Sequence, residues 1–255
     1  MTDDDIRLAQ RLADAAGVAI RPFFRAPFDL ERKADASPVT AADRAAEAAM
    51  RAILERERPQ DGIVGEEYGT TREGAERVWV LDPIDGTRSF VAGRAIFGTL
   101  IALVEAGKPV LGVIDQPVQG ERWIGAAGRP TLFNDAAVTT RACGGLADAI
   151  LATTGPGYFQ PDEMAAYDRC ILAARDSIWG GDCYNYGLLS LGHLDAVIEA
   201  GLKLYDFAAL VPVVEGAGGM MRDWQGRALD AGSRGQVVAV GDARLLEPIL
   251  AQVNA

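Results

Sequence analysis

Four acidic residues far apart in the chain occupy similar positions, each at the end of a predicted strand or the start of a predicted helix. They are Glu66, Asp82, Asp85 and Asp206. Carboxylates held close together repel one another and their pKa values rise, whereas divalent metal ions relieve this repulsion. Hard cations such as magnesium are bound mainly by carboxylate and carbonyl oxygens. If the four residues meet in the fold, they can hold two metal ions that activate a water and bind a phosphoryl oxygen.

Two of these acids belong to the segment from Asp82 to Thr87, which follows a run of apolar residues. Asp82 and Asp85 are three positions apart, so a straight strand cannot direct both side chains to one point. Pro83 fixes its own φ and is expected to end the strand, after which the chain can turn. Gly86 lets the backbone approach a ligand closely, and Thr87 lies where a helix N-terminus would offer N–H groups to a phosphate.

The same segment also has a simpler interpretation. Aspartate next to proline or glycine is common where a strand turns, and there its side chain only caps the turn. Spacing along the chain does not show that the four acids meet in space. From these residues alone, a structural turn and a metal site both remain possible.

Composition limits the kind of protein. The chain has 255 residues, of which 49% are hydrophobic, enough for one large domain or two closely associated lobes. A net charge of −11 disfavours nucleic acids and anionic membranes as partners. No apolar run reaches the roughly 20 residues that span a bilayer, and the acidic residues at positions 3–5 do not suit a signal peptide. Three cysteines without metal-ligand spacing indicate reduced thiols, so we expect a cytoplasmic protein.

Periodicity predicts helices followed by an antiparallel meander in the first half of the chain. Helices are expected over 3–21 and 40–57, and a loop over 69–76. The expected strands are 63–65, 77–81, 99–106, 109–116 and 121–126. A tight turn at Gly107-Lys108 would join two of these strands.

Strands and helices alternate in the second half. The expected strands are 149–153, 176–179, 196–199 and 237–240. The expected helices are 161–175, 184–191, 207–217 and 242–253. Pro212 predicts a kink in the third of these helices, and Gly218-Gly219 predicts its end. The alternation indicates a layered α/β (α+β) protein, with a weak boundary between two lobes near 140–146.

Three motifs in this order give the chain a family resemblance. They are Gly65-Glu66-Glu67, the stretch Asp82-Pro83-Ile84-Asp85-Gly86-Thr87-Arg88-Ser89-Phe90, and Tyr205-Asp206-Phe207-Ala208-Ala209 with Glu215-Gly216-Ala217-Gly218-Gly219. The chain resembles the inositol monophosphatase superfamily of magnesium-dependent, lithium-sensitive phosphatases. The resemblance implies one domain over 1–255 with the αβαβα sandwich of that superfamily.

The resemblance also implies two to three Mg²⁺ ions per subunit. The metal ligands that it assigns are Glu66, Asp82, the carbonyl of Ile84, Asp85 and Asp206. Asp43 would lie in the outer shell of a third, weaker ion. Tyr205 stands where the family usually has tryptophan, which leaves the metal role of Asp206 intact.

Catalytic roles carry over in the same way. Thr87, paired with Glu66, would orient and deprotonate the attacking water, and the Gly86 and Thr87 amides would hold the phosphate. Lys33 matches a family lysine in a loop near the metals, although a solvated surface lysine is an equal alternative. His193 is expected at the surface at a helix end, and Trp123 in the core rather than against a ligand.

The substrate depends on residues around the leaving group. Glu199 matches the leaving-group glutamate of the family, and Asp182 stands where inositol monophosphatases have a small residue. Two carboxylates suit a cationic leaving group through charge-assisted hydrogen bonds, and histidinol phosphate carries an ammonium and an imidazole. The segments 111–117, 121–125, 180–184 and 210–216 also resemble the histidinol-phosphatase branch. Alternatively, Asp182 is a helix N-cap and Glu199 an ordinary strand-end acid.

These implications give one favoured function and two alternatives. The favoured one is a Mg²⁺-dependent phosphomonoesterase that converts L-histidinol phosphate to L-histidinol and phosphate in histidine biosynthesis. The first alternative keeps this chemistry with an inositol, sugar or nucleotide phosphate. The second is a non-catalytic regulator that binds metal or phosphate. The family resemblance further implies a homodimer whose other partner is a small phosphate monoester.

Overall fold

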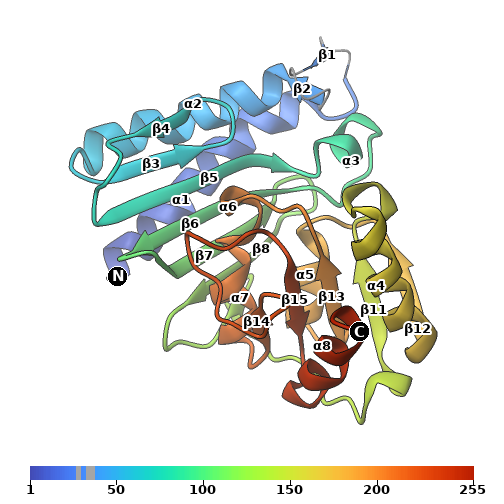
Figure 1. Cartoon of the computed structure of the whole chain (residues 1–255). Coiled ribbons are helices and arrows are strands. Elements are labelled where there is room, and N and C mark those ends of the chain that lie inside the picture. The colour runs from blue at the N-terminus through green and yellow to red at the C-terminus, as the bar shows by residue number, and fades with distance from the viewer. Residues whose placement is uncertain (27–29, 33–37) are drawn as a thin grey trace.

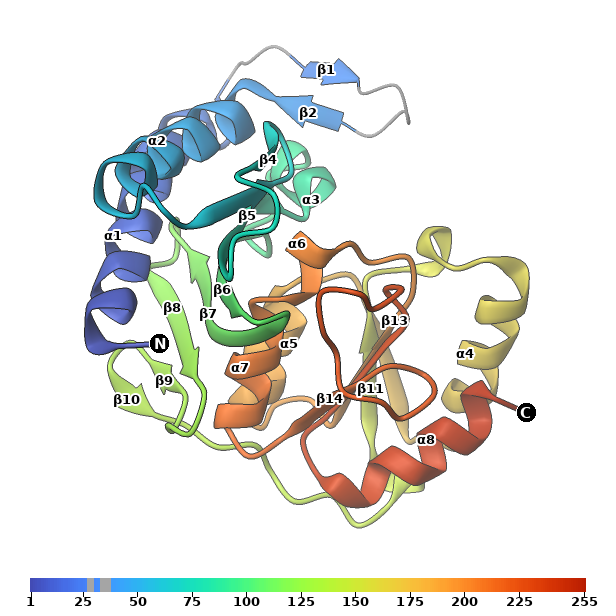
Figure 2. The same cartoon turned by 60° about the vertical axis from the view of Figure 1, so that its left-hand side comes forward.

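The structure, a computed structural model, describes residues 1–26, 30–32 and 38–255. Two β-sheets alternate with three layers of helices, which gives the expected αβαβα sandwich (Figure 1). Helices α1 (Asp3–Ile20) and α2 (Ala41–Glu57) cover the outer face of the first sheet (Figure 2). Helices α5 (Tyr184–Ser190) and α7 (Leu210–Gly216) fill the middle layer, and α4 (Pro161–Ala173) and α8 (Leu246–Val253) form the third.

The two N-terminal helices form where their sequence predicts. In α1 the residues Leu8, Leu12, Ala16 and Ile20 recur at helical spacing and are fully buried against the first sheet. The helix begins with a capping box, in which the Thr2 N–H donates to Asp5 Oδ2 at 2.7 Å. A short 3₁₀ helix (Arg21–Phe23) follows α1, and β1 (Leu30–Arg32) pairs with β2 (Pro38–Thr40) just before α2.

The first sheet has eight strands in the order β10-β9-β8-β7-β6-β5-β3-β4. Their bounds are β3 Gly62–Gly65, β4 Gly69–Thr71, β5 Arg77–Asp85, β6 Gly98–Glu105, β7 Lys108–Gln116, β8 Glu121–Ala126, β9 Leu132–Phe133 and β10 Ala136–Ala137. Strands β5 to β8 form the predicted antiparallel meander, and β3 runs parallel to β5. Because β3 and β5 are parallel, both end at the same edge of the sheet.

Three expectations for this sheet were wrong in detail. The segment 69–76 is not all loop, because β4 pairs with β3. Strand β5 continues to Asp85 instead of ending at Leu81, through an irregularity in its pairing with β6. The hairpin turn is Ala106-Gly107 and not Gly107-Lys108. Both turn residues have positive φ, 48° and 80°, as a two-residue type I′ turn requires.

The second sheet has five strands in the order β12-β11-β13-β15-β14. Their bounds are β11 Ile150–Thr153, β12 Asp176–Trp179, β13 Ala196–Glu199, β14 Met220–Arg222 and β15 Val237–Val240. Strands β12, β11 and β13 are parallel, so the residues that follow them lie at one edge of the sheet. Residues 138–149, with a 3₁₀ helix at Leu146–Asp148, connect the two sheets and contain the expected lobe boundary, which remains a prediction.

The expected helix 207–217 is in fact two helices, α6 (Leu204–Phe207) and α7. Pro212 lies in the first turn of α7, where backbone N–H groups have no acceptor within the helix, so proline is tolerated there. The expected kink at Pro212 is therefore replaced by a break before α7. At the other end, the Gly218 and Gly219 N–H groups donate to Glu215 O at 3.0 Å and Val214 O at 3.1 Å, which confirms the predicted glycine cap. Another 3₁₀ helix (Ala243–Leu245) precedes α8.

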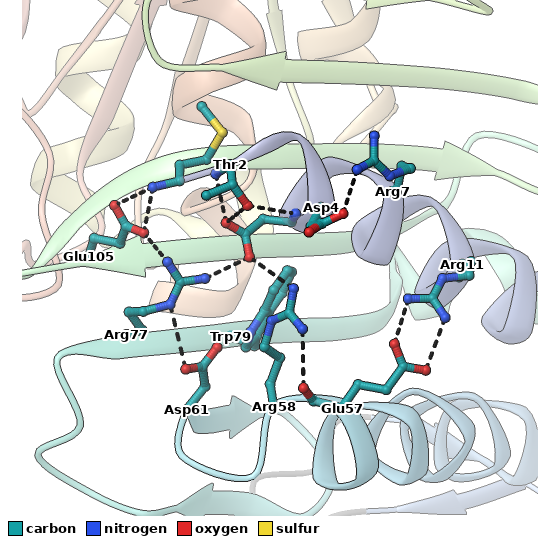
Figure 3. A network of polar contacts seen from close by, with 12 residues as sticks. Thr2, Asp4, Arg7, Arg11, Glu57, Arg58, Asp61, Arg77, Trp79 and Glu105 are labelled. Atoms are coloured by element: carbon teal, nitrogen blue, oxygen red, sulfur yellow. Dashed lines mark hydrogen bonds and ion pairs between the residues drawn. The ribbon is translucent and has the colours of Figure 1, made fainter.

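A polar network ties the start of α1 to the first sheet, at the end opposite the C-terminus of β5 (Figure 3). Asp5 Oδ1, almost fully buried, accepts a hydrogen bond from Arg77 Nη2 at 2.7 Å. The Arg77 guanidinium also pairs with Glu105 and Asp61, and the Trp79 indole N–H donates to Asp61 Oδ2 at 2.9 Å. Within the described residues, no helix is both long and apolar enough to cross a membrane.

Candidate active site

A cavity of about 240 Å³ opens where the edge at the end of β5 faces the edge at the ends of β11, β12 and β13. Nine of the predicted site residues line this cavity, which we call the acidic cleft. They are Glu66, Asp82, Ile84, Asp85, Gly86, Thr87, Asp182, Glu199 and Asp206. Lys33 lies outside the described residues.

The acidic cleft contains a compact group of three carboxylates. Asp82, Asp85 and Asp206 each contribute an oxygen, and these oxygens lie within 4.8 Å of one another. Asp82 is only 2% exposed, and its Oδ1 has no hydrogen-bond partner in the part of the chain that the structure describes. A buried carboxylate oxygen without a donor is costly unless a cation is bound beside it.

A bulge in β5 solves the spacing problem of Asp82 and Asp85. Asp82 is opposite Leu100 of β6 and Asp85 is opposite Gly98, so β5 has one more residue than β6 over this stretch. The extra residue lets both carboxylates reach the same side. Pro83 lies inside the bulge, and its carbonyl accepts a hydrogen bond from Thr99 Oγ1 at 2.8 Å.

Helix α6 brings Asp206 to this group from the second half of the chain, and α6 packs against β5. Asp206 is in the first turn of α6, where the Lys203 N–H donates to its Oδ2 at 2.5 Å. This bond fixes the carboxylate at the start of the helix, beside Asp82. Three of the four acids on which the metal-site interpretation depends therefore meet in the fold.

Glu66 forms a second acidic group with Asp43 and Glu67, again with oxygens within 4.8 Å. Glu66 directly follows β3, and its N–H donates to Leu81 O of the parallel strand β5 at 3.2 Å. The charge of Glu66 contributes to the raised pKa of both Asp82 and Asp206, so the two groups are neighbours.

Sequence reasoning missed the residues that hold the Glu66 segment in place. Glu47 of α2 is fully buried, and it accepts hydrogen bonds from the Glu67 N–H at 2.7 Å and the Tyr68 N–H at 3.2 Å. Arg51, one turn later, donates to Glu47 Oε1 at 2.7 Å. The spacing of Glu47 and Arg51 is the i, i+4 spacing of a helical ion pair, a signal that the sequence did offer.

The charges of the cleft are those of a cation site. Burial, and then nearby carboxylates of which Glu66 is the strongest, raise the pKa of Asp82 well above its usual value. Burial and then the charge of Asp182 raise the pKa of Asp85 in the same direction. Burial raises the pKa of Asp206 to about 7, although the Lys203 N–H opposes this effect. Divalent cations would remove the repulsion, so the donor set fits Mg²⁺ and its preference for oxygen ligands.

Gly86 and Thr87 join β5 to the short helix α3 (Thr87–Val91) at the wall of the cleft. Gly86 has φ +82°, and a Cβ added there would lie 2.7 Å from Asp182 Oδ2, so only glycine fits. The Thr87 hydroxyl donates to the Ile84 carbonyl, an expected metal ligand, at 3.1 Å. The expected pairing of Thr87 with Glu66 stays a prediction.

Two further acids line the opposite side of the cleft. Asp182 Oδ2 accepts a hydrogen bond from Ser89 Oγ at 2.8 Å. The N-cap interpretation of Asp182 was wrong, because α5 is preceded by Cys183 as its N-cap and has no side-chain cap. Glu199 is 1% exposed, and its Oε1 accepts bonds from the Thr154 N–H at 2.8 Å and the Thr154 hydroxyl at 2.9 Å. Burial raises the pKa of Glu199 to about 8.

Other contacts of the cleft were also missed. The Cys183 N–H donates to Asp85 Oδ2 at 2.6 Å, and the hydroxyls of Ser89 and Thr154 donate to Asp182 and Glu199. Thr154 and Cys183 could have been found from the sequence, because they follow shortly after the parallel strands β11 and β12. Two minor expectations are confirmed, because His193 is exposed after α5 and Trp123 is fully buried in the core.

Comparisons with known proteins find similar sequences and structures over almost the whole chain. The sequence model that describes the inositol monophosphatase family matches residues 2–255. The protein named bifunctional phosphatase IMPL2, chloroplastic, from Arabidopsis thaliana is 49% identical over 248 residues, which cover 94% of this chain and 72% of that protein. A histidinol-phosphatase from Mycobacterium tuberculosis is 35% identical over 266 residues and 100% of both chains. A solved structure described as an inositol monophosphatase from Zymomonas mobilis has a TM-score of 0.92 and 61% identity, over 99% of this chain and 98% of that one.

Proposed function

Because this chain belongs to the inositol monophosphatase family, and is thus a metal-dependent phosphatase of small phosphate monoesters, we propose that it hydrolyses L-histidinol phosphate to L-histidinol and phosphate. The observation that carries this proposal is the pair Asp182 and Glu199. These two carboxylates line the same cleft as the carboxylates of Asp82, Asp85 and Asp206. The histidinol-phosphatase from M. tuberculosis, which matches over its full length, supports the same substrate.

In this proposal the cleft holds two to three Mg²⁺ ions. Their ligands would be the carboxylates of Glu66, Asp82, Asp85 and Asp206 and the carbonyl of Ile84. When bound, the ions would supply positive charge for the phosphoryl oxygens and lower the pKa of a water. The unpartnered Asp82 Oδ1 supports a cation at this position.

The remaining roles belong to groups of the chain itself. Glu66 and Thr87 would orient the attacking water and accept its proton, and the amides of Gly86 and Thr87 would donate hydrogen bonds to the phosphate. Because Gly86 has no Cβ, the Asp182 side chain can lie directly against it. Lys33, outside the described residues, is proposed to act near the metals.

The leaving group would lie against Asp182 and Glu199. The Glu199 Oε2 is buried and has no hydrogen-bond partner among the described residues, so it can accept a donor from the substrate. An ammonium between the two carboxylates would form charge-assisted hydrogen bonds with both. The same ammonium would lower the pKa of Glu199 and favour its ionised form.

A second candidate keeps the chemistry and changes the leaving group to inositol or another sugar or nucleotide. The Z. mobilis structure, described as an inositol monophosphatase, favours it. The hydroxyl of Thr154, next to Glu199 in the cleft, would also suit a polyol.

The first prediction separates the two candidates. We expect Asp182→Asn to lower kcat/KM about 100-fold for histidinol phosphate and less than about fivefold for inositol 1-phosphate, because only the cationic substrate loses a charge-assisted bond. Asparagine tolerates the φ of +45° at this position, so the fold should not suffer. The measurement is phosphate release with Mg²⁺. Equal losses, or faster turnover of inositol 1-phosphate by the unchanged enzyme, would favour the second candidate.

We also propose a cytoplasmic homodimer with a role in histidine biosynthesis. Sedimentation velocity of the full chain would test the dimer. We expect Asp85→Asn to lose phosphate release completely. If phosphate release were unchanged in this variant, the alternative of a non-catalytic regulator would be favoured.

A further inference from the structure

A second cavity, of about 280 Å³, adjoins the acidic cleft between α3 and the 3₁₀ helix Pro156–Tyr158. It shares Arg88, Tyr158 and Asp182 with the cleft and extends beyond them to Arg94. We propose that this cavity, here called the arginine chamber, is an oxyanion site for a phosphate or carboxylate, separate from the position of the scissile phosphate. The proposal rests on the proposed function only in taking the neighbouring cleft as the hydrolytic site.

Two guanidinium groups give the arginine chamber its chemistry. The Cζ of Arg88 lies 5.1 Å from the centroid of the Tyr158 ring, which it covers. The Arg94 guanidinium lies over the backbone of Gly180, where a Cβ would be only 3.2 Å from its Nη2. Aromatic and backbone contacts of this kind hold a guanidinium in place while its N–H groups remain available.

Neither guanidinium is used elsewhere in the fold. Across the described ranges of the chain, the side chains of Arg88 and Arg94 form no hydrogen bond or ion pair, in contrast to arginines such as Arg77, Arg122 and Arg141. Both side chains are exposed, so in a chain with net charge −11 they form a local positive patch that can bind an anion from solution. A guanidinium binds phosphate or carboxylate oxygens through two parallel hydrogen bonds.

Asp182 stands at the boundary between the two cavities and does not neutralise both arginines. Its Oδ2 already accepts the Ser89 hydroxyl at 2.8 Å, and its single charge faces two cations. The chamber therefore keeps a net positive charge, whereas the adjoining cleft is strongly negative without metal. The glycines at 155 and 157 have no heavy atom of the described residues near their Cβ positions, which leaves room at the wall of the chamber.

The direct test uses inorganic phosphate and protein stripped of metal with EDTA. Without cations the acidic cleft repels phosphate, so saturable binding by calorimetry at low ionic strength reports on the arginine chamber. We expect Arg88→Gln and Arg94→Gln each to weaken binding about tenfold, and the double variant to abolish it. Arg175→Gln is the matched control, because Arg175 is exposed just before β12, at the end of that strand away from the chamber. This variant should bind phosphate with the same affinity as the unchanged protein.

Two results would overturn the proposal: no saturable phosphate binding to the metal-free protein, or equal binding by the double variant. Thermal unfolding of each variant checks that the fold is kept. This test does not involve hydrolysis, so its outcome is independent of whether histidinol phosphate is the substrate.

A kinetic comparison with Mg²⁺ identifies the source of the anion. If the anion is a second phosphate of the substrate, the double variant should lose about 100-fold in kcat/KM for a sugar bisphosphate and less than about threefold for the matching monophosphate. If the anion is free phosphate, the ratio of kcat/KM for the two substrates should be the same in the double variant as in the unchanged enzyme. The noncompetitive part of inhibition by phosphate should then disappear in the double variant. If neither quantity changes, the chamber has no role as an oxyanion site during turnover, and the proposal fails.

Discussion

At the scale of single residues, Gly86 lies where the cleft has no room for a side chain. Its φ of +82° is disfavoured for other residues, and a Cβ would meet Asp182 Oδ2 at 2.7 Å. The residue is thus constrained twice, by its own backbone and by a side chain that is 96 positions away in the sequence. Only the second constraint involves another residue of the acidic cleft.

Replacing Gly86 by alanine should therefore separate backbone strain from site damage. We expect Gly86→Ala to lower kcat about 100-fold or more, because Asp182 must move, while the strain itself costs about 1 kcal/mol. Gly74→Ala is the control, since Gly74 has a similar φ of +89° but open space around its Cβ position. The control should lose similar stability and keep its activity. If both variants were equally active, the contact with Asp182 would have no functional weight.

At the scale of elements, β5 joins a region that stabilises the fold to the region that forms the acidic cleft. Its first residue, Arg77, belongs to the polar network around Asp5, and its last, Asp85, belongs to the acidic cleft. Nine residues of strand separate them by roughly 26 Å. The network stabilises the docking of α1 on the sheet, whereas the bulge at the other end of β5 directs Asp82 and Asp85 into the acidic cleft.

The network should therefore affect stability without affecting catalysis. We expect Asp5→Ala to lower the free energy of unfolding by about 2 kcal/mol, because it removes a buried carboxylate from Arg77 and also the capping box of α1. Asp4→Ala, which breaks an exposed pair with Arg7, should cost less than about 0.5 kcal/mol. Urea unfolding measures both changes. A large fall in kcat of folded Asp5→Ala would contradict this separation.

At the scale of the whole molecule, the acidic cleft links stability to pH and to metal. In the metal-free fold, the pKa of Glu199 is about 8 and that of Asp206 about 7, above their ordinary values of 4.5 and 3.8. The folded state therefore binds protons more tightly than the unfolded state. The stability that these groups contribute is complete below about pH 4 and is lost as the pH rises through 7 to 8.

The metal-free protein should consequently become less stable between pH 5 and pH 8. Glu199→Gln should reduce this fall by about 3 kcal/mol, because the amide does not ionise. Urea unfolding in EDTA at the two pH values measures the difference. An equal fall in the variant would show that Glu199 is not protonated in the folded protein.

Magnesium should reverse the same trend. Ionised carboxylates bind the cation and protonated ones do not, so the increase in Tm on adding Mg²⁺ should be larger at pH 8 than at pH 5. Asp85→Asn should reduce the increase strongly at pH 8. A Tm that is indifferent to Mg²⁺ at both pH values would refute the metal site.

Much of the architecture was predictable because it depends on local patterns. Strands β8, β12, β13 and β15 have the bounds that alternation and apolar runs predict, and the helix end at Gly218-Gly219 follows from glycine alone. The break before α7 was not predictable, because it depends on neighbours. Helix α7 packs onto the backbone of β7 and β8, where a Cβ at Gly112 would lie 1.9 Å from Ala209 O and one at Gly125 would lie 2.2 Å from Pro212 O.

The sequence by itself determined which groups are available: the acids of the three motifs, the glycine at 86 and the second carboxylate at 182. Residue types and local spacing carry that information, because they need no distant partner. Only the tertiary structure decided that Asp206 lies beside Asp82, that a bulge aligns Asp85 with both, and that Arg88 lines both the acidic cleft and the adjoining arginine chamber. These relations depend on which edges of the two sheets face each other, which no local pattern encodes.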